Sequence, residues 1–449
     1  MHSGEKNKTP RKGNDRRLTE SIFGKGEFAV GDYQGAWWNR LDNAAKIFPP
    51  TSSKRDTKVF RFACELNELV DGDVLQKALD KTLEAFPIYR SVLRHGLFWY
   101  YFESSNLPAE VQQEWEPPCS SIYDSNRKSL LFKVTYFRCR INLEIYHALS
   151  DGTGAMQFLR LLVYHYLLFR HPEDLKNTPQ MDYDASFSQK MDDSFQKYYD
   201  KNGRKGNARH PKAYRIKGQK LPEHRIRVIE GVVSVKQALA KAHGYNATLT
   251  GFLTALLLCA IHEDRSLRDQ QKPVVLEIPV NLRKYFPSES ARNFFSVISA
   301  GYDFSKKPPD FEQVIRAVDD CFQKELTPEQ LSLRMNTFAA IEHNPFARVT
   351  PLILKDVALK IGYHAAAKES TGALSNIGKI SMPQELIPYI RLFDVFVSTN
   401  KLQICLCSFE DNLTLSFTSP FISTDIQKRF FRSLTSMGLE VEIASNLIH

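Results

Sequence analysis

A histidine, an aspartate and a glycine stand close together as His147, Asp151 and Gly152, in the pattern H-x-x-x-D-G. A neutral imidazole has a pKa of about 6.5, so His147 could take a proton from a hydroxyl group as a new bond forms. We expect Gly152 to allow a tight turn or a close backbone approach after the histidine. We expect Asp151 to hold this loop rather than to share in the chemistry. The pattern is short, and a packed histidine beside a helix-capping aspartate explains it about equally well.

The sequence around His147 indicates how it would be positioned. Apolar and polar residues alternate over residues 141–147, which is the period of a strand. Apolar residues then recur at helical spacing from Met156 to Leu167. A histidine at such a junction can leave the sheet and face a cleft.

Length and charge limit the classes of protein to consider. The chain has 449 residues, with 60 basic and 51 acidic side chains, a net charge of +9 and a pI of about 9.0. This length favours two large domains or subdomains. The modest, scattered excess of basic residues permits attraction to an anionic ligand but does not indicate nucleic-acid binding. No apolar stretch is long enough to span a bilayer, and residues 249–261 predict a buried helix.

The seven cysteines predict neither a disulfide framework nor a metal site. Their number is odd and no signal peptide precedes them, which favours a reduced, cytoplasmic setting. Cys405 and Cys407 form C-x-C within an alternating stretch, which favours two cysteines on one face of a strand. No second Cys/His cluster indicates zinc.

Composition divides the chain into four parts. Residues 1–27 are basic and expected to be disordered, with contact to phosphate or an anionic membrane as the alternative. Residues 28–175 form the expected N-terminal subdomain, 176–224 a polar crossover or linker, and 225–449 the C-terminal subdomain. A solvated linker is the simpler interpretation of 176–224, and an electrostatic landing site for a phosphorylated cofactor is the alternative. Its basic residues are Lys201, Arg204, Lys205, Arg209, Lys212, Arg215, Lys217 and Lys220.

Periodicity and breaker residues predict the regular elements. The expected strands cover 58–65, 97–102, 130–137, 141–147, 225–233, 274–280, 390–397, 402–409 and 413–417. The expected helical stretches include 73–86, 234–241, the buried run after Thr248, 331–338, 351–363 and 424–439. Asp411 and Asn412 are expected to form a hairpin turn, and Gly244 to end a helix.

Further motifs follow the H-x-x-x-D-G pattern in a definite order. They are Ile278-Pro279-Val280-Asn281-Leu282-Arg283, Arg292-Asn293-Phe294-Phe295 and Ser375-Asn376-Ile377-Gly378. Together they resemble the chloramphenicol acetyltransferase-like superfamily, which includes condensation domains and plant acyltransferases, and within it the alcohol acetyltransferase branch. The resemblance covers about residues 28–445. It departs from condensation domains at Tyr146, where they usually carry a second histidine, and it lacks the D-F-G-W-G motif of plant relatives.

The resemblance implies an α/β fold of two similarly built subdomains. Each would hold a mixed sheet covered by helices, with an active-site tunnel at their interface. His147 would be the general base that activates an acceptor hydroxyl for attack on an acyl thioester. The resemblance also implies that Asp151 pairs with an arginine, for which Arg283 is our candidate.

The tetrahedral intermediate of such a reaction needs hydrogen-bond donors for its oxyanion. Ser375 and Asn376 are our first candidates, with Asn293 second. Turn residues that cap backbone groups explain each of the three about as well. Acetyl-CoA or another acyl-CoA is the expected co-substrate, with no permanently bound cofactor and no metal.

Three classes of function remain open from the sequence. The first is an O-acyltransferase acting on a small-molecule alcohol, in a protein expected to be a cytoplasmic monomer. The second is an enzyme of the same fold that acylates an amine or takes its acyl group from a carrier protein. The third is a non-catalytic binding protein, which the presence of both His147 and Asp151 disfavours.

Overall fold

The computed structural model describes most of the chain. The described residues are 38–181, 193–200, 203, 212–305, 310–344, 347 and 349–446. The basic tail predicted over residues 1–27 lies outside them. So do four basic residues of the predicted linker, Lys201, Arg204, Lys205 and Arg209.

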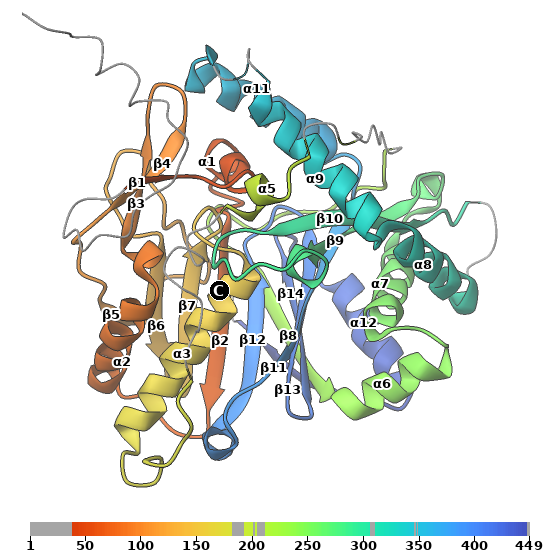
Figure 1. The fold of residues 1–449 in the computed structure, drawn as a ribbon. Coiled ribbons are helices and arrows are strands. Elements are labelled where there is room, and N and C mark those ends of the chain that lie inside the picture. Colours follow the sequence, from red (N-terminus) through yellow and green to blue (C-terminus); the bar gives the residue numbers. More distant parts are fainter. Residues whose placement is uncertain are drawn as a thin grey trace, which may run out of the picture. The chain divides into compact units, whose positions relative to one another are not determined.

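The first large sheet has the strand order β12-β2-β7-β6-β5. It is mixed, because β5 runs parallel to β6 whereas the other neighbours are antiparallel. Helices α2 and α3 pack against each other, and α3 also packs on β2 and β7 (Figure 1). The bounds are β2 (Val59–Leu66), α2 (Gly72–Ala85), β5 (Val111–Gln113), β6 (Phe132–Phe137), β7 (Arg140–Tyr146), α3 (Gly152–Arg170) and β12 (Ile390–Val397).

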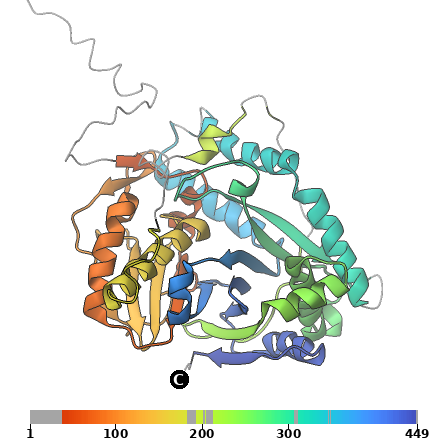
Figure 2. The ribbon, with the colours of Figure 1, turned by 60° about the horizontal axis from the view of Figure 1, so that its bottom comes forward.

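The second large sheet has the order β10-β9-β11-β13-β14-β8-β15. It is also mixed, since β11 runs parallel to both β13 and β9. Helix α7 packs on β9 and β10 and is flanked by α6, α8 and α12 (Figure 2). The bounds are β8 (Arg227–Ser234), α6 (Val235–Gly244), α7 (Leu249–Asp264), β9 (Val274–Asn281), β10 (Phe295–Tyr302), α8 (Phe311–Glu325), β11 (Gly372–Ile380), β13 (Leu402–Phe409), β14 (Asn412–Ser419), α12 (Asp425–Ser436) and β15 (Glu442–Ser445).

A small antiparallel sheet, β1-β4-β3, and several short helices complete the described part. The strands are β1 (Trp38–Arg40), β3 (Ser91–His95) and β4 (Tyr100–Ser104). The α-helices are α1 (Phe48–Thr51), α5 (Ser194–Lys197), α9 (Pro328–His343) and α11 (Leu352–Ala366). The 3-10 helices are η1 (Ala45–Ile47), η2 (Pro87–Arg90), η3 (Leu267–Asp269), η4 (Leu282–Lys284) and η5 (Gln384–Tyr389).

Strand β12 links the two halves of the sequence. It comes from the predicted C-terminal part, yet it pairs with β2, for example Val395 with Phe62 (Figure 1). β13 then returns to the second sheet, with Cys405 and Cys407 facing the first core and Ile404 and Leu406 the second. The prediction that both cysteines lie on one face of a strand is therefore confirmed, and both remain free thiols.

Most expected elements are present, with shifts at their ends. Residues 390–397 and 402–409 form strands with the predicted bounds. The predicted turn at Asp411 and Asn412 is wrong by one residue, because Glu410 takes the positive φ of 50° and Asn412 already belongs to β14. Gly244 lies inside α6 rather than after it, and the left-handed position falls on Asn246 (φ 53°). The final helix ends at Ser436, and no side-chain bond caps its start.

Six of the described strands were not predicted, namely β1, β3, β5, β10, β11 and β15. β11 contains Gly372, Asn376 and Gly378, residue types that are depleted in strands. It forms because neighbours on both sides pair with its backbone. Tertiary pairing here outweighs local propensity.

None of the described helices is by itself long and apolar enough to cross a membrane. The pair α6 and α7 passes the same test only when joined, and it is bent by 79°.

Candidate active site

His147 is the first residue after β7 and lies at a meeting point of both sheets. Its backbone N–H donates to Lys58 O at 2.8 Å, which continues the pairing of β7 with β2. Its half-buried ring stacks on Phe48 of α1, with centroids 4.5 Å apart and planes 17° apart. The rings of Phe60 in β2 and Phe295 in β10 also pack against it, with centroids 4.9 Å and 5.6 Å from that of the imidazole. The imidazole is thus held between aromatic rings from three elements.

Asn293 determines which nitrogen of His147 carries the proton. Its Nδ2 donates to the carbonyl oxygens of His147 at 3.0 Å and Ala148 at 3.4 Å. Carbonyls only accept, so these two contacts fix the orientation of the amide. Its Oδ1 then faces His147 Nδ1 at 3.2 Å and can only accept. Nδ1 therefore carries the hydrogen, and Nε2 keeps the lone pair that a general base needs.

Burial keeps His147 neutral. Removal from water lowers the pKa of His147 below its ordinary value of 6.5. Its own backbone carbonyl, the negative charge of Asp151 and the bond to Asn293 act in the opposite direction but do not outweigh burial. The ring is consequently neutral near pH 7.

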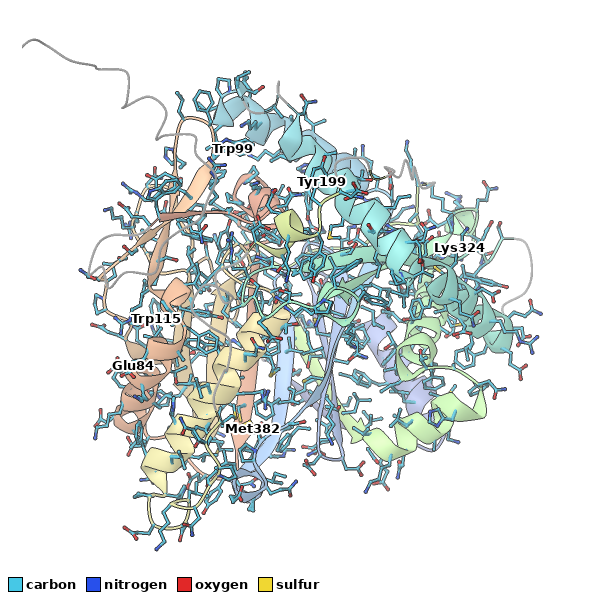
Figure 3. All side chains as sticks on the ribbon, in the orientation of Figure 1. Glu84, Trp99, Trp115, Tyr199, Lys324 and Met382 are labelled. Carbon is cyan, nitrogen blue, oxygen red and sulfur yellow. The ribbon has the colours of Figure 1, made fainter. Side chains whose placement is uncertain are left out.

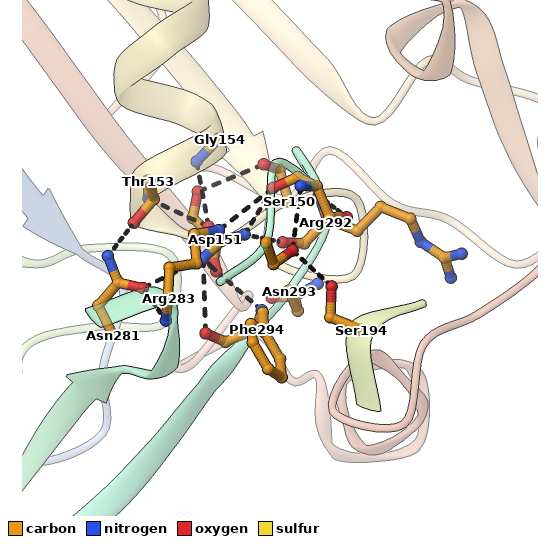
Figure 4. A network of polar contacts seen from close by, with 12 residues as sticks. Ser150, Asp151, Thr153, Gly154, Ser194, Asn281, Arg283, Arg292, Asn293 and Phe294 are labelled. Carbon is orange, nitrogen blue, oxygen red and sulfur yellow. Dashed lines mark hydrogen bonds and ion pairs between the residues drawn. The ribbon is translucent and has the colours of Figure 1, made fainter. Parts of the chain in front are cut away.

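The carboxylate of Asp151 is buried and fully engaged. Its Oδ1 accepts from the backbone N–H groups of Thr153 and Gly154, both at 3.1 Å, and so caps α3. Its Oδ2 accepts from Arg283 Nη1 at 2.7 Å and from Phe294 N at 2.9 Å (Figure 4). The sequence prediction named Arg283 as the partner of Asp151, and the structure brings the two together. No oxygen of this carboxylate contacts His147 among the described residues.

Two loops are joined around this ion pair. Arg283 Nη2 donates to Arg292 O at 2.6 Å and to Ser290 O at 2.8 Å. Ser150 Oγ donates to Ala291 O at 2.6 Å. The loop before β10 is therefore fastened to the loop that carries His147, which fixes Asn293 beside the ring.

Two glycines allow this close approach, and only one was predicted. A Cβ at Gly152 would meet Ile377 Cδ1 at 3.0 Å, which agrees with the expected close contact. A Cβ at Gly154 would lie 2.1 Å from Ala291 O, far inside any allowed contact. The sequence analysis missed Gly154, although its place two residues after Gly152 was a visible signal.

Sequence reasoning also missed Asp42 and Arg292, which lie behind Asn293. Both side chains are buried, and Arg292 Nε lies 3.7 Å from Asp42 Oδ2. Asp42 Oδ2 is also 3.3 Å from Asn293 Nδ2. Burial raises the pKa of Asp42 to about 6, and the charge of Arg292 opposes this. Asp42 belongs to no recognisable sequence motif, whereas Arg292 directly precedes the candidate Asn293.

Two of the three candidate oxyanion donors, Ser375 and Asn376, lie on β11 and point in different directions. Asn376 is exposed, with Nδ2 donating to Thr250 Oγ1 at 2.8 Å and Oδ1 accepting from Gly378 N at 2.8 Å. Ser375 pairs with Cys405 of β13, whose side chain belongs to the first core, so Ser375 lies on that face of β11. Ala148 and Leu149, which follow His147, belong to the same core. Asn376 points toward α7, and the third candidate, Asn293, has its Nδ2 occupied by carbonyls.

Two further features of the site were considered in the sequence, a metal ion and a tunnel that reaches His147. No group of three or more metal-ligating side chains occurs among the described residues. A cavity of about 370 Å³ lies between α3 and η5, lined in part by Arg160, Met181 and Met382, and His147 does not line it. The tunnel at His147 stays a prediction.

Comparison with solved structures shows which fold this is. No family model and no curated protein matches the sequence. The structure of Fusarium sporotrichioides TRI101 complexed with coenzyme A and T-2 matches with a TM-score of 0.58 and 10% identity, over 91% of this chain and 99% of that one. The starter condensation domain of rhizomide synthetase RzmA, in complex with C8-CoA, matches with a TM-score of 0.60 and 12% identity, over 89% and 94%. This chain has the chloramphenicol acetyltransferase-like fold.

A third match carries the same architecture. TRI3 trichothecene 15-O-acetyltransferase from Fusarium sporotrichioides aligns with a TM-score of 0.56 and 12% identity, over 89% of this chain and 94% of that one. The expected α/β chloramphenicol acetyltransferase-like fold, with mixed sheets covered by helices, is confirmed. At such identities the likeness concerns the fold, so the reaction has to be argued from the residues of this chain.

Proposed function

We propose that this protein is an acyltransferase that moves an acyl group, acetyl by preference, from acyl-CoA to the hydroxyl group of a small-molecule alcohol. The observation that carries this proposal is the state of His147. Its ring is neutral, its Nδ1 is held by Asn293 Oδ1 at 3.2 Å, and no described residue bonds to Nε2. A neutral imidazole with one free lone pair is the arrangement that general-base catalysis requires.

The proposed reaction needs no acylated side chain. His147 Nε2 takes the proton of the acceptor hydroxyl while that oxygen attacks the thioester carbonyl. The tetrahedral intermediate collapses by breaking the carbon–sulfur bond, and the imidazolium returns its proton to the leaving sulfur. The products are an ester and a free thiol, so atoms and charges balance.

Ser375 is the donor we assign to the oxyanion. Its hydroxyl makes no hydrogen bond to the described residues, and it lies on the same face of the sheet as its pairing partner Cys405, toward the first core. A donor of this kind typically contributes about 10²–10³ in rate. Asp151 and Arg283 act as positioning residues, since their contacts fasten the loop rather than reach the ring.

The identity of the donor is supported by the solved neighbours. TRI101 was crystallised with coenzyme A and the RzmA domain with C8-CoA. Because this chain shares their fold over about nine-tenths of its length, a soluble acyl-CoA is the donor we propose. Because condensation domains are also among the neighbours, a second candidate is an enzyme that acylates an amine or takes its acyl group from a carrier protein.

The deciding experiment measures thiol release from acetyl-CoA with the purified full-length chain. The acceptors are a panel of alcohols and a matched panel of amines of the same carbon skeletons. Release that depends on an alcohol and yields the ester supports the proposal. Thiol release only with amines would show that the protein is the second candidate, an enzyme that acylates an amine. No release with either panel, from acetyl-CoA or longer acyl-CoA, while the chain remains folded, contradicts the acyl-CoA proposal.

A further inference from the structure

Helix α11 is apolar on both sides, although only one side is covered. Leu352 is buried, and Asp356 and Tyr363 turn toward the same side. The opposite face exposes Ile353 (77%), Leu354 (60%), Val357 (51%) and Ile361 (66%). Contiguous exposed apolar patches mark interaction sites.

The inner side of α11 is firmly anchored, so the exposed face is not a result of loose packing. Tyr100 Oη donates to Asp356 Oδ2 at 2.7 Å, and Lys58 Nζ donates to Tyr363 Oη at 2.8 Å. The helix also packs on α1. These bonds fix which face of α11 points outward.

A second segment extends the apolar surface. The β3–β4 hairpin tip exposes Leu97 (71%) and Phe98 (38%). Leu352 N donates to Leu97 O at 2.9 Å, and Lys355 Nζ lies 3.3 Å from the centroid of the Trp99 ring. Figure 3 shows Trp99 beside α11. Segments about 250 residues apart in sequence thus form one apolar surface, which we call the α11 surface.

The exposed charged side chain of α11 itself is the cation Lys360, which forms no ion pair with the described residues. Exposed Lys368 follows the end of the helix and adjoins the partly exposed Glu369. The carboxylate of Asp356 is turned inward to Tyr100. Apolar side chains flanked by cations characterise helices that lie in the interface of an anionic bilayer.

We propose that the α11 surface docks this protein on an anionic lipid bilayer, with α11 lying in the plane of the interface. Ile353, Leu354, Val357 and Ile361 would enter the acyl boundary while Lys360 and Lys368 contact the headgroups. A second copy of the chain fits the α11 surface less well. A two-fold contact places the same patch opposite itself, and here it would bring lysines of both copies together.

The docked helix lies one layer from the candidate site. α11 packs on α1, and Phe48 of α1 stacks on the ring of His147. Bilayer docking and acyl transfer are nevertheless separate claims, because no residue of the α11 surface contacts His147 among the described residues. Each can therefore fail without the other.

The test is co-sedimentation of the full-length chain with vesicles of phosphatidylcholine alone and of phosphatidylcholine mixed with phosphatidylserine. The wild type should bind the mixed vesicles. Ile353→Asp/Ile361→Asp should lower the partition coefficient by roughly tenfold or more, because two apolar anchors are lost. Lys360→Ala/Lys368→Ala should lower binding to the mixed vesicles by about fivefold per lysine and leave binding to pure phosphatidylcholine unchanged.

Trp115→Asp is the matched control, because Trp115 is 77% exposed but lies beside α2, away from α11 (Figure 3). This variant should bind vesicles as the wild type does. The proposal is overturned if the wild type binds neither vesicle, or if Ile353→Asp/Ile361→Asp binds as well as the wild type. It is also overturned if light scattering shows a dimer that this double variant converts to a monomer without vesicle binding in either protein.

Discussion

At the scale of single residues, the state of His147 depends on the amide of Asn293. The sequence offered Asn293 as a donor to an oxyanion, but its Nδ2 is occupied by the carbonyls of His147 and Ala148. The atom of Asn293 that matters for the proposed reaction is Oδ1, because it accepts a hydrogen bond from His147 Nδ1 and so keeps the hydrogen on that nitrogen. The sequence cannot distinguish a donor to an oxyanion from an acceptor for the imidazole, because both roles require an asparagine near the histidine.

Removing this amide should slow the reaction without weakening substrate binding. Asn293→Ala is expected to lower kcat by about 10–100-fold, the usual effect of losing a group that orients a catalytic imidazole. KM should change little, because the side-chain amide of Asn293 is engaged by the His147 ring and by the carbonyls of His147 and Ala148. Steady-state kinetics tests this, with the exposed Asn126→Ala as the matched control. A variant with wild-type kcat and a raised KM would assign Asn293 to substrate binding instead.

The pH dependence of the rate should report the titration of His147. Burial lowers the pKa of His147, so activity should persist below about pH 6.5 and fall only in more acidic solution, where the ring is protonated. Asp42 has a pKa of about 6 and titrates in a similar range. The profile of kcat/KM should therefore be measured for Asp42→Asn as well, and its acid limb should remain. An acid limb that disappears in Asp42→Asn would mean that the aspartate controls the rate.

At the scale of elements, the position of His147 depends on how closely α3 approaches the loop before β10. Gly154 permits this approach, because a Cβ there would lie 2.1 Å from Ala291 O. The Asp151–Arg283 pair then fastens the contact at 2.7 Å. The sequence predicted the ion pair through the family resemblance, whereas the requirement at Gly154 follows only from the distance between the two loops.

Gly154→Ala should therefore destabilise the fold severely. We expect a loss of about 3 kcal/mol or more in the free energy of unfolding, since backbone must move to admit the methyl group. Gly244→Ala in α6 is the matched control, because nothing lies within 4 Å of a Cβ there. It should be neutral or stabilising by up to about 1 kcal/mol. Urea unfolding measures both, and equal effects of the two substitutions would contradict the close approach.

At the scale of the whole described molecule, a cluster of charges joins the two sheets. Arg140 of β7 donates to both carboxylate oxygens of Glu230 on β8, at 2.8 Å and 3.0 Å. It also donates to Glu65 at 2.6 Å and lies 3.7 Å from Asp394 on β12. Burial raises the pKa of Asp394 to about 8, the charge of Glu230 adds to this effect, and Arg140 opposes it. Asp394 is therefore protonated at neutral pH in the folded protein.

The free energy of unfolding should depend on pH because of Asp394. Its pKa is raised from about 4 in the unfolded chain, so its contribution is complete below about pH 4 and is lost as the pH rises through about 8. Asp394→Asn cannot ionise and should lack this dependence. The stability of the wild type relative to Asp394→Asn should thus decline between about pH 5 and about pH 8, measured by urea unfolding. A difference that is constant over this range would mean that Asp394 is ionised in the folded state.

Sequence periodicity was sufficient for individual elements but not for their partners. Strands 390–397 and 402–409 were predicted with the bounds they have, and the second alternates clearly around Cys405 and Cys407. No local pattern shows that the first pairs with β2 while the second pairs with β11. Asp42 went unnoticed for the same reason, since its role depends on a contact with Asn293, 251 positions away. The motif around His147 was visible because its residues are close in sequence.

The most direct test of the proposed general base compares wild type, His147→Ala and His243→Ala in acetyl transfer to an alcohol, with thermal melting of all three proteins. His243 is exposed on α6 and serves as the matched control. The account predicts that His147→Ala melts like the wild type and loses about 10²–10⁴ in kcat, the scale of a positioned general base, while His243→Ala keeps full activity. A His147→Ala protein that melts normally and retains more than about a tenth of the wild-type rate would contradict the role of His147 as the base.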